Sequence, residues 1–350
     1  MKGYSISTKS LPIKPSRESN VELLRLICMF MIVLRHFIFQ PLSGESLLAR
    51  SELGQVLDSL CYIGVNCFIL ISGWFTIKFS WKGLFNLFFI CAFYGTLAYV
   101  FHLFYDGGSV GKSLFFYALM PFSHSCWWFI NAYLILYLTS PLINLAVSHL
   151  DTNQDLLILV LLTIINVYFG NIWQTPLFND NGFNGSQMIY LYWIGICLRR
   201  HFSVEWISKR RIFLFGGYIL ASILLFFLAK LSREFGVEWI HLGYNNIVVL
   251  LSSICFFLSF VSFQFHSRFI NYVAASALAV YLIQENTYFG FGYLYPLVGR
   301  FYEGSSSLGM QLLFLILFSL SFFILAVLLD QIRRGISLQI IKLWNKNEVI

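Results

Sequence analysis

The first long apolar stretch of the chain runs from Val21 to Phe39 and reads VELLRLICMFMIVLRHFIF. A helix that spans a bilayer needs about 20 mainly apolar residues. This stretch has that length and that apolarity, and it predicts a transmembrane helix near residues 21–40. Because no cleavable signal pattern precedes it, we expect this helix itself to be the insertion signal.

Two ionisable side chains interrupt the stretch at a helical spacing. Arg25 and His36 are eleven residues apart, about three turns, so they share one face of the helix roughly 16 Å apart along its axis. Burying a cation in hydrocarbon costs at least about 2.5 kcal/mol on insertion scales, and such residues usually face a functional interior. The neighbouring Arg35 is interpreted as an anchor at the membrane interface.

Composition extends the membrane assignment to the whole chain. Of its 350 residues, 58% are hydrophobic and only 11% are charged, which is too apolar for a soluble globule. The pattern predicts an all-α integral membrane protein with about ten transmembrane helices. We expect these helices near residues 21–40, 55–77, 83–105, 125–147, 155–173, 186–200, 211–230, 244–265, 272–292 and 309–331. We predict a single ten-helix membrane domain over 20–332, flanked by cytosolic segments at 1–19 and 333–350.

Orientation follows from the Lys and Arg residues of the connecting segments, which concentrate on the cytosolic side. With a cytosolic N-terminus, most of them fall inside: Lys2, Lys9, Lys14, Arg17, Lys78, Lys82, Arg199, Arg200, Lys209, Arg210, Arg211, Arg268, Arg333, Arg334, Lys342 and Lys346. Far fewer fall outside: Arg50, Lys112, Lys230, Arg233 and Arg300. Both termini are therefore predicted to be cytoplasmic, in a multi-pass protein of the cell (plasma or inner) membrane. The net charge of +7 is then mostly a topology signal, and we expect no nucleic-acid partner.

Several other site classes have no motif in the sequence. The seven cysteines lie in or beside apolar segments without the spacing of metal ligands, so they are interpreted as small core residues. We expect no metal site, and we find no glycine-rich phosphate loop. The sequence says nothing about oligomeric state.

Polar residues in the second and fourth predicted spans are further candidates. Asn66 lies deep in the second span and needs a partner, whereas Ser72 and Gly73 would allow close helix packing. Just beyond this span, Lys78 and Lys82 are four residues apart and would face one anion if they are helical; the alternative is ordinary positive-inside charge.

The fourth span opens with a second polar and aromatic group. His124 and Asn131 are seven residues apart and share one face, with His124 at the outer mouth. Trp128 fits either an aromatic belt at the interface or a platform on which a sugar ring stacks.

The ninth span contains Tyr281, Gln284, Glu285 and Asn286. Three consecutive polar residues cannot share one helical face, so we expect a break, a water-lined cavity or a crowded interior here. Glu285 is the only carboxylate that we place deep in a span. It must be protonated, paired or catalytic, and Arg25, Arg35 and His36 are its candidate partners.

These elements, in this order, resemble those of the acyltransferase-3 superfamily of integral membrane acyltransferases, in particular the branch that modifies bacterial surface polysaccharides. The elements are Arg25-x10-His36, the Asn66–Trp74 stretch ending in Ile-Ser-Gly-Trp, the stretch WFINAYLILYLTSPL from Trp128 to Leu142, and VYLIQEN from Val280 to Asn286. The resemblance covers roughly residues 20–330.

The resemblance implies an O-acyltransferase that moves an acyl group, usually acetyl, from acetyl-CoA to a hydroxyl of a surface or lipid-linked glycan. His36 occupies the place of the family's essential histidine and Arg25 that of its essential arginine. Lys78 and Lys82 stand where relatives carry basic residues that meet the CoA phosphates. Gln284 departs from the family, because many relatives have His at this position.

We expect acyl-CoA as a donor substrate and no tightly bound cofactor. His36 and Glu285 are the predicted catalytic residues, and Arg25, Lys78 and Lys82 the donor-binding ones. The predicted substrate-binding residues are Asn66, His124, Trp128, Asn131 and Tyr281. His36 could act as a general base or carry the acyl group covalently. The alternative functions are a glycolipid or polysaccharide transporter and a polysaccharide polymerase.

The orientation can be tested by labelling with a membrane-impermeant thiol reagent in a variant that lacks the native cysteines. We expect Glu205→Cys, in the segment Ser203–Lys209, to be labelled only after the membrane is opened. Thr175→Cys, in the segment Gln174–Asn184, should be labelled in intact cells. Labelling of position 205 from outside would reverse the topology and with it the route of acetyl-CoA.

Overall fold

The computed structural model describes residues 18–105, 116, 118–122, 127–236 and 242–347, with side chains up to residue 339. All regular structure in these residues is helical. The helices are α1 (Ser19–Phe39), α2 (Leu47–Arg50), α3 (Glu52–Cys61), α4 (Gly64–Phe75), α5 (Trp81–Tyr105), α7 (Trp128–His149), α8 (Thr152–Thr163), α9 (Gly185–His201), α10 (Val204–Lys209), α11 (Arg211–Phe235), α12 (Ile247–Val261), α13 (Arg268–Ala274), α14 (Ala277–Gln284), α15 (Tyr295–Glu303) and α16 (Leu308–Asn347). A 3-10 turn, η1 (Pro41–Gly44), and two π-helical segments, η2 (Ile164–Ile172) and η3 (Thr287–Leu294), complete the order.

Six helical segments in the described part are long and apolar enough to cross a membrane: Glu52–Phe75, Trp81–Tyr105, Trp128–His149, Thr152–Ile172, Arg211–Phe235 and Leu308–Gln339. The other four predicted spans also coincide with helices, but α9 has 17 residues and α12 has 15. α1 has 21 residues and carries three charged side chains, and the ninth span is divided between α13 and α14. The all-helical membrane fold is thus confirmed, whereas ten spans stay a prediction.

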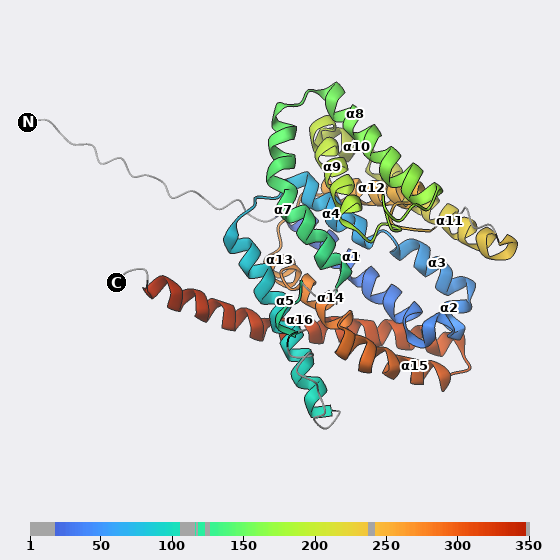
Figure 1. Cartoon of the computed structure of the whole chain (residues 1–350). Coiled ribbons are helices and arrows are strands. Elements are labelled where there is room, and N and C mark those ends of the chain that lie inside the picture. Colours follow the sequence, from blue (N-terminus) through green and yellow to red (C-terminus); the bar gives the residue numbers. More distant parts are fainter. Residues whose placement is uncertain (1–17, 106–115, 117, 123–126, 237–241, 348–350) are drawn as a thin grey trace, which may run out of the picture.

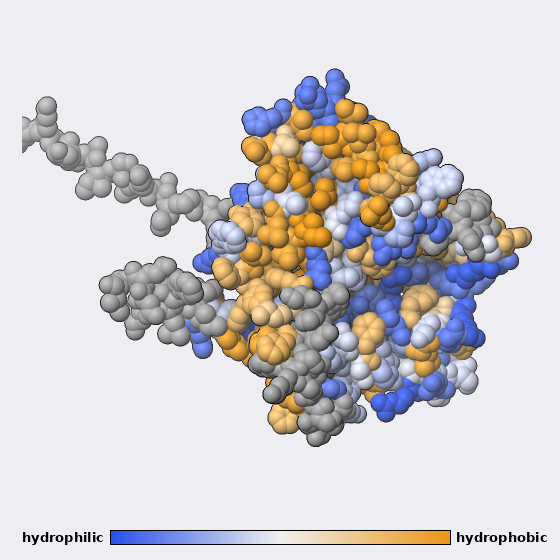
Figure 2. All heavy atoms as spheres, in the orientation of Figure 1, coloured by the Kyte–Doolittle hydropathy of each residue, from blue (hydrophilic) through white to orange (hydrophobic). Residues whose placement is uncertain are grey.

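Exposed apolar side chains cover much of the outside, as a protein surrounded by lipid requires. The space-filling view shows them as a broad apolar area over α7, α8 and their neighbours, bordered by hydrophilic residues (Figure 2). Leu142 on α7 is 71% exposed, and Leu157 on α8 is 58% exposed. Because so much apolar surface would not stay dispersed in water, this surface supports a multi-pass membrane protein.

α1 lies in the middle of the bundle (Figure 1), packed against α3, α4, α12, α13, α14 and α16. Its first half contributes Leu24 and Cys28 to a core cluster formed mainly with α4, α9 and α12. Its second half contributes Val33 and Phe37 to another cluster formed mainly with α14, α15 and α16. The helix that the sequence singled out is therefore the element that joins the two halves of the core.

α13 and α14 run beside α1 in the same direction. The backbone amide of Ser267, at the start of α13, donates to Ser19 Oγ at 2.8 Å. At the other end, just past α14, Glu285 lies against His36. The break expected in the ninth span is present here: α14 ends at Gln284, and the side chain of Asn286 caps the next helix by accepting from two backbone amides.

Two glycine positions make these close approaches possible. A Cβ at Gly290 would lie 1.8 Å from the carbonyl oxygen of Gln284, so only glycine lets the chain fold back after the break. A Cβ at Gly73 on α4 would lie 2.2 Å from the carbonyl of Tyr192 on α9. The close helix packing expected at Ser72 and Gly73 is therefore confirmed, with α9 as the partner.

Several predicted inner connections meet at one end of the molecule. Asn20, near the start of α1, donates to the carbonyl of Val261 at the end of α12, at 3.0 Å. Arg211, at the start of α11, donates to Ser262 Oγ at 2.9 Å. The segments around residues 20, 211, 262 and 267 are thus gathered on one side. Which side of the membrane this end faces stays a prediction, as does the cytoplasmic location of both termini.

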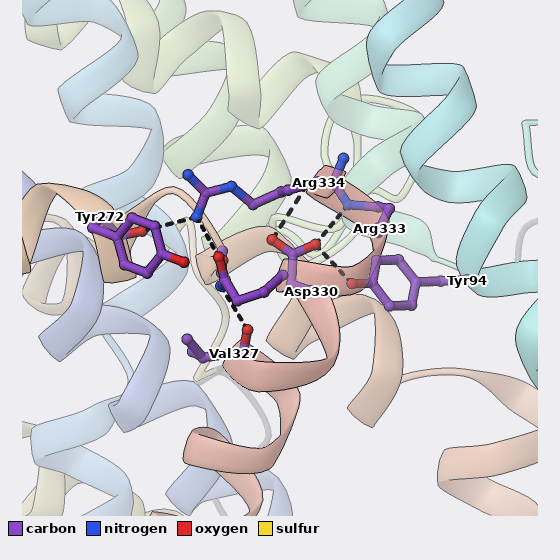
Figure 3. A network of polar contacts seen from close by, with 8 residues as sticks. Tyr94, Tyr272, Val327, Asp330, Arg333 and Arg334 are labelled. Carbon is purple, nitrogen blue, oxygen red and sulfur yellow. Dashed lines mark hydrogen bonds and ion pairs between the residues drawn. The ribbon is translucent and has the colours of Figure 1, made fainter. Parts of the chain in front are cut away.

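A buried ionic cluster fastens α16 to its neighbours (Figure 3). Asp330 is fully buried and accepts from Tyr94 on α5 at 2.7 Å and from Arg333 at 2.6 Å. Arg334 donates to the carbonyl of Tyr272 on α13 at 3.1 Å. α16 continues as a helix to Asn347, and Arg333, which we expected in a cytosolic tail, is only 6% exposed.

We expect Asp330→Ala to destabilise the folded protein, because it leaves the Arg333 guanidinium buried without its carboxylate. Removing one partner of a buried pair typically costs about 3–5 kcal/mol. Thermal unfolding of the detergent-solubilised protein should therefore begin at a clearly lower temperature. Glu303→Ala, at an exposed carboxylate, is the control. Equal unfolding curves for the two variants would show that the cluster does not stabilise α16.

Candidate active site

A cavity of about 320 Å³ lies between the two core clusters, alongside α1. Its walls come from α1, α4, α5, α7 and the α13–α14 pair. Its polar and aromatic lining includes Glu22, Arg25, His36, Ser72, Trp128, Tyr133, Tyr244 and Tyr281. Four of the predicted site residues, Arg25, His36, Trp128 and Tyr281, thus line one space, and its volume is in the range of ligand pockets.

His36 is held from one side of its ring. Its Nδ1 lies 3.0 Å from Glu285 Oε1 and 3.3 Å from Gln284 Oε1. Both neighbours offer acceptor oxygens, so the hydrogen bonds are satisfied when Nδ1 carries a proton. The His36 and Glu285 side chains are only 11% and 10% exposed, so the pair is nearly enclosed.

This arrangement leaves the second ring nitrogen available. Nε2 of His36 has no partner among the residues that the structure describes, and the ring lines the cavity. A neutral imidazole with its proton on Nδ1 presents the lone pair of Nε2, which accepts a proton or attacks a carbonyl. Glu285 then stabilises the ring in its positively charged form.

Each partner of His36 is itself fixed. Tyr295 OH donates to Glu285 Oε1, and Gln284 Nε2 donates to the backbone carbonyl of Val33 at 3.1 Å. The second bond determines the orientation of the Gln284 amide, because it leaves the oxygen to face His36. The sequence reasoning set position 284 aside, yet Gln284 is a positioning residue for the imidazole.

Arg25 lines the other end of the same cavity and forms an ion pair inside its own helix. Its Nη1 lies 2.7 Å from Glu22 Oε1; the Arg25 side chain is 33% exposed, whereas that of Glu22 is 6% exposed. Same-face placement of Arg25 and His36 is therefore confirmed. The sequence reasoning missed Glu22, although its spacing of three residues from Arg25 is typical of a helical ion pair.

Three further carboxylates are buried, all near the ends of predicted spans. Glu22 is 4% exposed, and both Asp155 and Asp330 are fully buried. Each of these has a basic partner nearby: Arg25 for Glu22, Arg200 at 2.5 Å for Asp155, and Arg333 for Asp330. Asp155 also lies 3.7 Å from Nε2 of His201. Glu285 differs from the others because its imidazole partner, His36, lines the cavity.

Arg35 does not act as a free interface anchor, which corrects our expectation. Its Nε donates to Asp58 Oδ1 at 2.6 Å, and its guanidinium lies 4.3 Å from the centre of the Tyr62 ring. The pair joins α1 to α3 one residue away from His36. The charge of Arg35 is thus paired with Asp58. Of the three candidate partners predicted for Glu285, the one that it contacts is His36.

An aromatic wall closes the cavity beside His36. Trp128 stacks on Tyr244 with ring centres 5.7 Å apart, and Phe183 packs edge-on against Trp128 at 4.6 Å. Tyr281 packs edge-on against Phe129 at 5.8 Å. Trp128 thus lines the interior, and the belt at the membrane interface that we weighed for it does not describe its position.

The remaining predicted site residues lie elsewhere. Asn66 is fully buried behind the wall, where its Nδ2 donates to the carbonyl of Tyr244 at 2.9 Å, so it supports the wall instead of lining the cavity. Asn131 is not among the lining residues, and Lys78 and Lys82 are exposed beyond α4. His124 lies outside the described residues.

No cluster of three or more metal-ligating side chains is present in the described residues.

Comparison with known proteins identifies the family. A family model described as an acyltransferase domain, that of the acyltransferase-3 family, matches residues 18–330. No curated protein and no solved structure matches the chain. The matched region begins at the start of α1 and ends at Asp330 on α16, so it includes the cavity and every residue around His36. The chain belongs to the acyltransferase-3 family.

Proposed function

We propose that this membrane acyltransferase moves an acetyl group from cytosolic acetyl-CoA to a hydroxyl of a surface or lipid-linked polysaccharide. One observation carries the proposal: a nearly enclosed His36–Glu285 pair opens onto the same cavity as Arg25. A buried base suits the activation of a hydroxyl, and a cation at the other end suits an anionic donor. The family supplies acyl transfer; the acetyl group, its carrier and the polysaccharide are our proposal.

The donor would enter from the Arg25 end. CoA is a large polyanion, and its phosphates would stay near Arg25. Lys78, on the non-helical segment after α4, and Lys82, in the first turn of α5, are exposed and would be further cations. A cavity of about 320 Å³ accommodates the pantetheine arm of CoA and not the whole molecule. The thioester would then reach His36, about 16 Å further along α1.

His36 would act as a general base on the acceptor hydroxyl. Nε2 takes the hydroxyl proton as the oxygen attacks the thioester carbonyl, and Glu285 stabilises the imidazolium that forms. The proton then passes to the departing thiolate. Transfer through an acyl-histidine uses the same free Nε2, so both routes depend on His36.

The direct experiment follows radiolabelled acetyl-CoA in membranes that contain this protein. We expect protein-dependent incorporation of label into surface or lipid-linked glycan, released by mild base as an ester would be. Incorporation from acetyl-CoA without any change in glycan export or chain length would distinguish this enzyme from a transporter or a polymerase. No incorporation from any acyl-CoA would refute the donor.

We expect His36→Gln to lower the transfer rate by about 10²–10⁴-fold, the usual contribution of one positioned general base. Glutamine keeps a polar side chain of similar reach but cannot take up a proton or an acyl group. The measurement is acetyl transfer per monodisperse protein molecule. His149→Gln, at the exposed end of α7, is the matched control and should retain the rate. Near-normal activity in His36→Gln would refute the mechanism.

The two partners of His36 should differ in their effect. Glu285→Gln keeps an oxygen near Nδ1 but removes the charge that stabilises the imidazolium, so we expect a loss of roughly 10²-fold or more. Gln284→Ala removes a neutral acceptor while Glu285 still holds Nδ1, so it should cost about ten-fold or less. Transfer rates at equal amounts of folded protein compare them. Similar losses in both variants would mean that the carboxylate charge has no special role.

A further inference from the structure

The hydroxyl of Tyr281 is buried in the cavity wall, and its O–H has no acceptor among the described residues. Tyr281 lies on α14, is 5% exposed and lines the same cavity as His36. The backbone amide of Phe129 faces the hydroxyl oxygen as a donor, so the proton of the hydroxyl is the part left without a partner. Buried polar groups in native proteins are almost always hydrogen-bonded, and an exception needs an explanation.

Tyr281 lies along the cavity between the His36 end and the Arg25 end. Tyr281 precedes Gln284 by three residues, so the two lie on one face of α14, one turn apart. α14 runs beside α1 in the same direction, and Gln284 is level with His36. Tyr281 is therefore displaced from His36 toward the Arg25 end, the side from which the acyl donor would approach.

Other buried groups without a partner do not fit this place. Nε1 of Trp127 also has none among the described residues, and neither does Oδ1 of Asn131. Neither residue lines the cavity, and a carbonyl oxygen cannot donate to another oxygen. Glu22 Oε2 lines the cavity but is an acceptor, three turns or more from His36. Of these groups, Tyr281 OH is the one that both lines the cavity and can donate a hydrogen bond.

We propose that Tyr281 is a catalytic residue whose O–H donates a hydrogen bond to the carbonyl oxygen of the acyl donor. The inference rests on the proposed acyl-CoA chemistry of the same site. The acceptor oxygen bonds to the carbonyl carbon, its proton moves to His36 Nε2, and the π electrons of the C=O bond collect on the oxygen facing Tyr281. When the C=O bond re-forms, the C–S bond breaks and the thiolate takes the proton from His36.

The phenol suits this role because it is neutral and fixed. A donor already aimed at the position of the developing oxyanion needs no reorganisation during the reaction, and in a site with little water it contributes strongly. The edge-on contact with Phe129 holds the ring in place, and the cavity wall excludes competing solvent. The carbonyl oxygen of the substrate is the acceptor that the free protein lacks.

Tyr281→Phe removes only the hydroxyl and keeps the packing of the ring. We expect kcat for acetyl transfer to fall by about 10²-fold or more, as when one oxyanion donor is removed, with KM for acetyl-CoA little changed. Thermal stability should change little, because the O–H of Tyr281 donates to no group in the free protein.

Tyr218→Phe is the matched control, since Tyr218 is equally buried but its hydroxyl donates to the backbone carbonyl of Leu60 at 3.1 Å, away from the cavity. It should lose stability and keep its kcat. The opposite pattern, in which Tyr281→Phe loses stability and keeps kcat, would make the hydroxyl structural and overturn the proposal.

A second measurement tests the hydrogen bond itself. In the dithioester analogue of acetyl-CoA, sulfur replaces the carbonyl oxygen and is a weaker acceptor. For each protein, the transfer rate from acetyl-CoA is divided by the transfer rate from the dithioester analogue. This ratio should be at least about ten-fold larger for the wild type than for Tyr281→Phe. Equal ratios would overturn the assignment while leaving the proposed function intact. A wild type that transfers from no acyl-CoA would instead refute the proposed function, and the assignment with it.

Discussion

The fold is organised around one costly interaction, the burial of the His36–Glu285 pair inside an apolar bundle. A buried carboxylate is tolerated only when charge and hydrogen bonds compensate its lost hydration. Here His36 Nδ1 and the hydroxyl of Tyr295 donate hydrogen bonds to the carboxylate of Glu285. The chain reaches this geometry because α14 ends at Gln284 and the next helical segment begins after Asn286. The break in the ninth span thus places Glu285 beside His36.

The central position of α1 follows from the same constraint. It must bring Arg25 and His36 to one cavity while its other faces fill two core clusters, so nearly every neighbouring helix packs against it. Arg25 and His36, to which we assign donor binding and proton transfer, are thereby kept apart on one helix. A donor that spans this distance would expose its thioester only at the end where the base lies, which separates binding of the phosphates from chemistry.

Local pattern predicted the helices, the placement of Arg25 and His36 on one face, and the break near Glu285, because each depends on residues close together in the sequence. The contacts that give the site its chemistry are not local: Gln284 and His36 are 248 positions apart. Asn66 looked equally functional from its depth, yet it supports the backbone of Tyr244. A polar residue in the middle of a predicted span must have a hydrogen-bond partner. Only the structure shows whether that partner belongs to the protein or would come from a substrate.

That distinction can be drawn from which polar atoms are satisfied. Asn66 Nδ2, Gln284 Nε2 and His36 Nδ1 each have a hydrogen-bond partner within the protein. These bonds hold the side chains around the cavity in place. Tyr281 OH has no acceptor and Glu22 Oε2 no donor among the described residues, and both residues line the cavity. A membrane interior offers little water to satisfy such atoms, so leaving them open costs stability unless a ligand with complementary groups completes them. These open atoms thus mark where hydrogen-bonding groups of an elongated substrate would complete the cavity wall, an acceptor at Tyr281 and a donor at Glu22.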